Sequence, residues 1–191
     1  MKERDWAERV AEIIKRSSGQ YKVEVEKGLL YASQVREHGG EKPKREEVSY
    51  KTDLLVSEQM EGGRWTPRVV IETKVIKKKG RGVTTHDAIT YSQKATDHKN
   101  VYPYLRYGIS VGNIGELGLP GRLFRHGVAF DFMVSWKGFC PTEQEEGTLI
   151  RIVQEEFQIS RELEEMFFDS RKRNRRKYCA IHKPLKTEIL S

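Results

Sequence analysis

The chain has 191 residues, of which 37% are hydrophobic and 33% charged, and its formal net charge is +7. These values fit a single domain over 1–191 with a highly charged surface, and no run of about 18 apolar residues occurs that would form a transmembrane helix. The first five residues lack the apolar core of a secretion signal, and the two cysteines form no CxxC motif, so we expect an intracellular, cytoplasmic protein. The basic excess is compatible with a polyanionic partner.

The first predicted element is a helix over 5–16, capped by Asp5, because its apolar residues recur at helical spacing. Glu8 and Glu12 are four residues apart and share one face of this helix. We favour a solvated stripe for these two acids. The alternative is that one of them reaches a metal site.

The next part of the chain predicts strands. Alternating residues predict a half-buried strand over 21–26, and 29–35 forms either a short strand or a turn of helix. The stretch 36–47 is rich in charged residues and also contains two glycines and a proline, which predicts an exposed loop. Two apolar, β-branched strands follow over 50–57 and 68–76, joined by a loop or hairpin end.

The second half of the chain predicts a crossover connection. A helix over 84–100 can be capped by Thr84 or Thr85, and strands follow over 104–112 and 128–134. Strand, helix and strand in this order indicate a mixed sheet. The glycine-rich residues 115–127 between the last two strands predict a loop.

A long apolar helix is predicted after Thr142, which is a good N-cap, with a break near Ser160. Three acidic residues in its first turn favour the helix dipole. We expect this helix, with the basic tail up to residue 191, to pack on the domain or to form a dimer face.

Two neighbouring predicted strands carry charged side chains among apolar residues. Glu72 and Lys74 are two residues apart, so in a strand they share one face, and Asp53 lies in the preceding strand. Buried charge is costly unless it is paired or used, so this set indicates a divalent-metal site. The carboxylates and the Thr73 carbonyl supply the oxygen ligands that Mg²⁺ prefers, and Lys74 can approach the attacking water or a phosphate. The alternative is an ion pair between Glu72 and Lys74 at a solvent edge.

The pattern of Asp53 in one strand and Glu72-Thr73-Lys74 in the next, followed by a helix and a strand, resembles the PD-(D/E)XK nuclease superfamily. Thr52 stands where the motif's name has proline. The resemblance implies an α/β, restriction-endonuclease-like fold with a mixed central β-sheet flanked by α-helices. It also implies that Asp53 and Glu72 bind the metal and that Lys74 positions or activates water.

The resemblance implies two further contributions to the site. The family often adds a polar residue from the helix after the motif, for which Gln93 is the candidate. Some members add a glutamate from the first helix, a role that Glu8 or Glu12 would fill.

The implied function is that of a Mg²⁺-dependent DNA endonuclease, with Mn²⁺ as the alternative ion, most like a small type II restriction enzyme of a prokaryote. Such a chain would cut double-stranded DNA as a homodimer. A repair or recombination nuclease that recognises DNA structure, and a non-catalytic DNA-binding module of the same fold, are the alternatives. The cations expected to contact the DNA backbone are Lys77, Lys78, Lys79, Arg81, Lys94, Arg171, Lys172, Arg173, Arg175 and Arg176.

Overall fold

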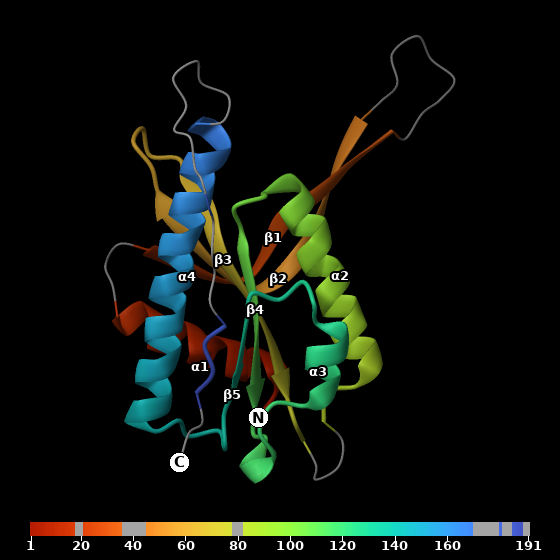
Figure 1. Cartoon of the computed structure of the whole chain (residues 1–191), viewed down its shortest axis with the longest axis vertical. Coiled ribbons are helices and arrows are strands. Elements are labelled where there is room, and N and C mark those ends of the chain that lie inside the picture. The colour runs from red at the N-terminus through yellow and green to blue at the C-terminus, as the bar shows by residue number, and fades with distance from the viewer. Residues whose placement is uncertain (18–20, 36–44, 78–81, 170–179, 181–184, 189–191) are drawn as a thin grey trace.

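The computed structural model describes residues 1–17, 21–35, 45–77, 82–169, 180 and 185–188, and its centre is a five-stranded mixed sheet (Figure 1). The strand order is β1-β2-β3-β4-β5. Neighbours from β1 to β3 are antiparallel, and β3, β4 and β5 run parallel. The predicted mixed α/β architecture is therefore confirmed. The strands are β1 (Tyr21–Val35), β2 (Arg45–Gln59), β3 (Trp65–Val75), β4 (Arg106–Gly112) and β5 (Phe132–Ser135).

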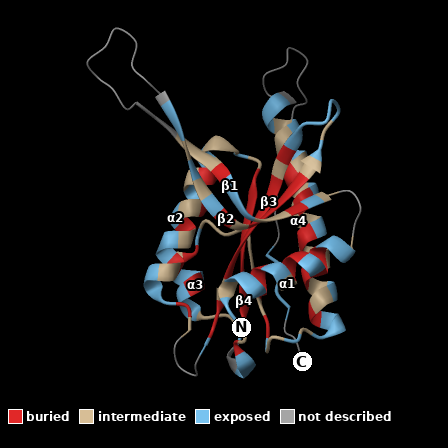
Figure 2. Cartoon of the chain, turned by 180° about the vertical axis from the view of Figure 1, so that it is seen from behind, coloured by how far each residue is buried: buried red, intermediate tan, exposed pale blue. Residues whose placement is uncertain are grey.

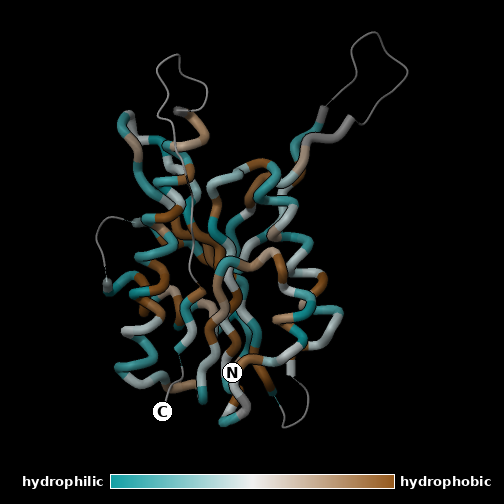
Figure 3. Tube along the Cα trace, in the orientation of Figure 1, coloured by the Kyte–Doolittle hydropathy of each residue, from teal (hydrophilic) through white to brown (hydrophobic). Residues whose placement is uncertain are grey.

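Helices cover both faces of the sheet (Figure 1). One face carries α1 and α4, and the other carries α2 and α3. Figure 2 shows that the buried residues concentrate in the central strands, and Figure 3 shows apolar positions gathered in the same region with hydrophilic positions outside. The helices are α1 (Glu3–Arg16), α2 (Thr85–Val101), α3 (Gly121–His126) and α4 (Glu143–Asp169), with a short 3-10 helix, η1 (Gly115–Leu117).

The first helix is held by two buried tryptophans. Trp6 is fully buried, and its ring meets that of Trp136 edge to face at 5.5 Å between centroids. The helix begins three residues earlier than predicted, because Lys2 and not Asp5 is its N-cap. Instead the backbone N–H of Lys2 donates to Oδ2 of Asp5 at 2.9 Å, which places Asp5 in the third helical position.

The first two strands are longer than predicted and form a ribbon that extends beyond the rest of the sheet (Figure 1). The expected loop over 36–47 is wrong for 45–47, which belong to β2, while 36–44 lie outside the described residues. Charged residues occupy this ribbon because cross-strand pairing with β1, rather than burial, holds it. β2 pairs with β3 only over 54–59.

Two later elements also differ from expectation. The loop predicted over 115–127 contains η1 and α3, because Pro120 begins a single helical turn that inserts buried Leu123 into the core. The final strand is confined to the four residues of β5. The expected break near Ser160 does not occur.

Helix α4 packs on the sheet through buried ion pairs. Arg68 of β3 is 1% exposed and pairs with Glu164 at 2.5 Å, and Arg106 of β4 pairs with Glu156 at 2.5 Å. Ser160 faces inward between them and is fully buried. Within the described residues, none of the helices has the length and apolar character needed to cross a membrane.

Candidate functional site

The candidate site lies at a fork between two strands. The register that pairs Leu54 with Ile71 would place Asp53 opposite Glu72 at the next position, where β2 and β3 begin to separate. Oδ2 of Asp53 accepts hydrogen bonds from the backbone N–H of Thr73 at 2.7 Å and from its hydroxyl at 3.0 Å. The Asp53 carboxylate therefore joins the two strands where their ladder ends, and the structure brings Asp53 and Glu72 together.

Glu72 is a buried acid with half of its hydrogen-bonding capacity unused. Its Oε1 accepts the Tyr107 hydroxyl at 2.5 Å and lies 2.8 Å from the Lys94 ammonium. Its Oε2 is buried and has no hydrogen-bond partner among the described residues. Burial raises the pKa of Glu72; Lys94 opposes that rise, and the negative charge of Asp53 adds to it.

Lys94, predicted as a DNA contact, reaches this site from α2 and pairs with Glu72. Its ammonium also donates to the carbonyl of Lys51 at 2.9 Å and lies 5.5 Å from the centre of the Tyr91 ring. Burial, together with the charges of Asp53 and Glu72, raises the pKa of Tyr91, so its hydroxyl stays neutral. Lys94 is thus the cation that balances Glu72.

Gln93, the predicted polar contributor from this helix, does not join the site. It is exposed, and its amide donates to Oδ1 of Asp97 at 2.8 Å. The reason is helical geometry, since successive residues are rotated by about 100°. The side of α2 that faces the sheet carries Ala88, Ala95 and His98.

Lys74 lies on the expected face, but acids other than the predicted ones hold its ammonium. It pairs with Asp87 at 3.1 Å and with Glu3 at 3.2 Å, two residues in the first turns of α2 and α1. Burial lowers the pKa of Lys74, but the hydrogen bonds to Asp87 and Glu3 outweigh it and the net shift is upward. Lys74 is therefore a firmly protonated cation beside the fork, and the alternative of an ion pair between Lys74 and Glu72 is not what the structure shows.

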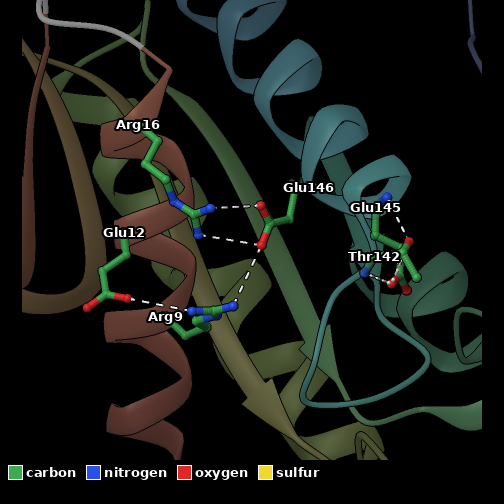
Figure 4. A network of polar contacts seen from close by, with 6 residues as sticks. All are labelled: Arg9, Glu12, Arg16, Thr142, Glu145 and Glu146. Atoms are coloured by element: carbon green, nitrogen blue, oxygen red, sulfur yellow. Dashed lines mark hydrogen bonds and ion pairs between the residues drawn. The ribbon is translucent and has the colours of Figure 1, made fainter.

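The two glutamates predicted from the first helix point elsewhere. Glu8 pairs with Arg4 at 3.0 Å, and both side chains are at least half exposed. Glu12 pairs with Arg9 at 3.9 Å, on the side of α1 where Arg9 also meets Glu146 of α4 (Figure 4). The contribution of α1 comes from Glu3 instead, because only the first turn of α1 reaches the end of β3 that carries Lys74.

The site offers a metal ion two carboxylates as ligands. No group of three or more His, Cys, Asp or Glu side chains in the described part of the chain is arranged to hold a metal ion. Mg²⁺, however, keeps several waters and is commonly held by one or two carboxylates together with substrate phosphates. Glu72, whose Oε2 is buried and unused, and Asp53, at the opposing position where the ladder ends, are the two carboxylates that such an ion would use. Thr73, predicted as a third ligand through its carbonyl, orients Asp53 through its amide and hydroxyl.

Most of the predicted DNA contacts lie outside the described residues. Lys77 is exposed just beyond β3 and can meet a polyanion. Residues 78–81 and 170–179 are not described, which leaves the roles of Lys78, Lys79, Arg81, Arg171, Lys172, Arg173, Arg175 and Arg176 as predictions.

Four residues of the site were missed or assigned another role at the level of sequence, namely Tyr107, Lys94, Glu3 and Asp87. A signal existed for Lys94, since it lies three residues after Tyr91 and four before His98 and therefore on the inner side of α2. A signal for Asp87 was its position three residues after Thr84 in a capping box. Tyr107 and Glu3 required the pairing of β3 with β4 and the placement of α1, which no local pattern contains.

Comparison with known proteins adds no family assignment. The chain matches no known family model, and no curated protein is similar to it in sequence. Inferences about its function therefore depend on the chemistry of the fork itself: a buried acid, a second acid across the strands, and two lysines.

Proposed function

We propose that the chain is a Mg²⁺-dependent DNA endonuclease of the PD-(D/E)XK type. The observation that carries the proposal is the buried Glu72, whose Oε2 is unused, beside Asp53 at the fork. A carboxylate oxygen buried without a partner costs stability, and a bound cation would offset that cost. The proposed cation is hydrated and lies between Glu72 and Asp53.

Each residue of the fork would have a separate role in the reaction. Asp53 and Glu72 would hold Mg²⁺, which polarises a phosphoryl oxygen and lowers the pKa of bound water when it is present. Thr73 fixes the rotamer of Asp53, and Tyr107 and Lys94 fix that of Glu72. Lys74 is firmly protonated, so it would act as a positive charge that stabilises the phosphorane-like transition state and not as a base.

The net charge of +7 supports a nucleic-acid substrate, since lysine and arginine neutralise phosphates. Double-stranded DNA and a homodimer, with one site for each strand, remain the predicted partner and assembly. A type II restriction enzyme is the specific form that we propose.

The test is cleavage of supercoiled plasmid in the presence of Mg²⁺. We expect nicked and linear products from the wild-type chain, none in the presence of EDTA, and loss of cleavage in Asp53→Asn and Glu72→Gln. Glu61→Gln, in the exposed turn between β2 and β3, is the matched control and should cleave normally. Discrete fragments favour a restriction enzyme, whereas cleavage of branched or damaged DNA alone favours repair. An Asp53→Asn variant as active as the wild type would overturn the proposal.

A second candidate function is a DNA-binding module without catalysis, and the position of Lys74 favours it. Glu3 and Asp87 already neutralise this lysine, and Lys94 already neutralises one oxygen of Glu72. An ion-pair network closed in this way can be purely structural. Electrophoretic mobility shifts of plasmid fragments, without any cleavage in Mg²⁺ or Mn²⁺, would support this alternative.

A further inference from the structure

A pocket of about 240 Å³ is lined by residues of β1, β2 and β3 and by Tyr102. Its apolar lining comes from Leu29, Leu55, Pro67, Trp65 and Tyr102. Its charged lining comes from Lys22, Lys27 and Glu24. The pocket therefore combines flat aromatic surface with cations, which is the chemistry that recognises an unpaired base and the phosphates beside it.

Trp65 is the residue of the pocket that most clearly indicates a bound ligand. It is 42% exposed, whereas the other two tryptophans of the chain, Trp6 and Trp136, are fully buried. The Lys22 ammonium lies 5.6 Å from the centre of the Trp65 ring. The ammonium lies over the ring, so a base would stack on the other face of Trp65 while Lys22 meets a phosphate.

The charges of the pocket leave a net positive surface. Both Lys22 and Lys27 pair with Glu24, at 3.0 and 3.2 Å. Two cations therefore share one carboxylate, and one positive charge stays available for a phosphate. An uncharged aromatic ligand would gain nothing from this positive charge. A nucleotide, which carries a phosphate, therefore fits the lining better.

The pocket is close to the fork along two strands. Leu55 in its wall is two residues from Asp53 on β2, about 7 Å along a strand. At its other side, Lys27 and Gly28 pair across β1–β2 with Thr52 and Lys51, the residues immediately before Asp53. Leu55 also packs in the same cluster as Tyr107, whose hydroxyl donates to Glu72. Trp65 is seven residues from Glu72 on β3, about 23 Å along the strand, so a DNA strand with a phosphate at the fork would bring a base several nucleotides away to Trp65.

We infer that this pocket binds one unpaired base of the DNA strand, several nucleotides from the bond that is cut, with Trp65 as the stacking platform and Lys22 and Lys27 at the phosphate. The inference rests on the proposed function in taking DNA as the substrate. It adds that the substrate is single-stranded or has a base extruded from the duplex, since a paired base cannot enter.

Intrinsic tryptophan fluorescence tests the inference without any cleavage. A short homothymidine oligonucleotide is added in the presence of EDTA to the wild type, Trp65→Phe and Trp65→Ala. We expect quenching in the wild type, because Trp65 is the tryptophan that a base can touch, and none in Trp65→Phe, which keeps the affinity measured by fluorescence anisotropy of a labelled strand. Trp65→Ala should weaken Kd by between about five- and 150-fold.

Thymidine monophosphate is the second probe, and it should quench far more weakly than the oligonucleotide because it lacks the flanking phosphates. Equal affinity for both probes would identify a free-nucleotide site and overturn the inference. Unchanged emission on binding, or an unchanged Kd in Trp65→Ala, would also overturn it. If the wild type cleaves plasmid in that case, the proposed function stands and only the pocket fails; if no nucleic acid binds, both fail. Should Trp65→Ala not fold, Lys22→Ala replaces it, with a weaker Kd expected and an unchanged Kd overturning the inference.

Discussion

Replacing Glu72 by Gln should make the apo protein more stable at neutral pH. Glu72 is fully buried, its Oε2 has no partner in the described part of the chain, and burial and Asp53 raise its pKa. An acid whose folded pKa lies above its unfolded value of 4.5 binds more protons in the folded state between those two values. Stability is therefore lost as pH rises from 4.5 through the folded pKa, and a neutral amide avoids that loss.

The size of the effect follows from proton linkage. One group contributes at most about 1.4 kcal/mol of unfolding free energy for each pH unit in that window. For a chain of this length, about 1 kcal/mol moves the melting temperature by about 2–4 °C, so the variant should gain up to about 3–6 °C per pH unit. Loss of the pair with Lys94 opposes the gain only partly, since Lys94 keeps its bond to the carbonyl of Lys51.

Thermal unfolding of the wild type and Glu72→Gln across a pH series, without divalent ions, measures the difference. Glu61→Gln serves as the exposed control and should follow the wild type. Mg²⁺ should then raise the melting temperature of the wild type and leave the Glu72→Gln variant unchanged, because binding to the folded state stabilises it. A difference between the two proteins that is constant with pH, or that favours the wild type as pH rises, would refute the assignment of Glu72 as a strained, buried acid.

Three further predictions concern residues around the site and the core. Burial lowers the pKa of His98 from 6.5 to about 4, so protonation of this imidazole favours the unfolded state. The unfolding free energy is unaffected above pH 6.5 and should fall by about 3 kcal/mol as the pH drops towards 4. Urea unfolding of His98→Leu should not show this loss. Tyr107→Phe removes the hydroxyl that donates to Glu72, which should cost about 1.5–3 kcal/mol in urea unfolding; a neutral result would mean that Lys94 alone satisfies Oε1. Gly108→Ala would place a methyl group 2.3 Å from the Phe132 ring, and the crowding should lower the unfolding free energy by about 1–3 kcal/mol in the same assay, whereas Gly121→Ala, with open space at that point, should cost less.

Local patterns were sufficient for most of the fold. The 3.6-residue spacing in α1 and the apolar runs of β3 and β4 each report on burial along one element, and the Thr84 cap marked the start of α2. The ribbon of β1 and β2 was underestimated because its charged residues, such as Glu46 and Glu47, are held by cross-strand pairing and not by a buried face. Helix α3 was missed because a single turn anchored by Leu123 has too few residues to display a period.

The candidate site was predictable only in part, for a different reason. Asp53, Glu72 and Lys74 could be found because charge within an apolar strand stands out. Their partners come from other elements: Tyr107 from β4, Lys94 from α2 and Glu3 from α1. Which lysine pairs with which acid depends on the distances between those elements. In the folded chain Lys94 pairs with Glu72, whereas Lys74 pairs with Glu3 and Asp87.

The edge-to-face contact of Trp6 with Trp136 has a consequence for the order of events during synthesis. The two rings are separated by 130 positions, as are Arg16 and Glu146, which also join α1 to α4. At about 5–20 residues per second, a ribosome needs roughly 7–26 s to make that interval. The part of α1 that Trp136 and α4 cover stays exposed for this time, whereas the rest of its apolar side can already pack on β1, β2 and β3. The pair of Glu3 with Lys74 needs only α1 and β3, so this part of the fork can form before the contacts of α1 with Trp136 and α4.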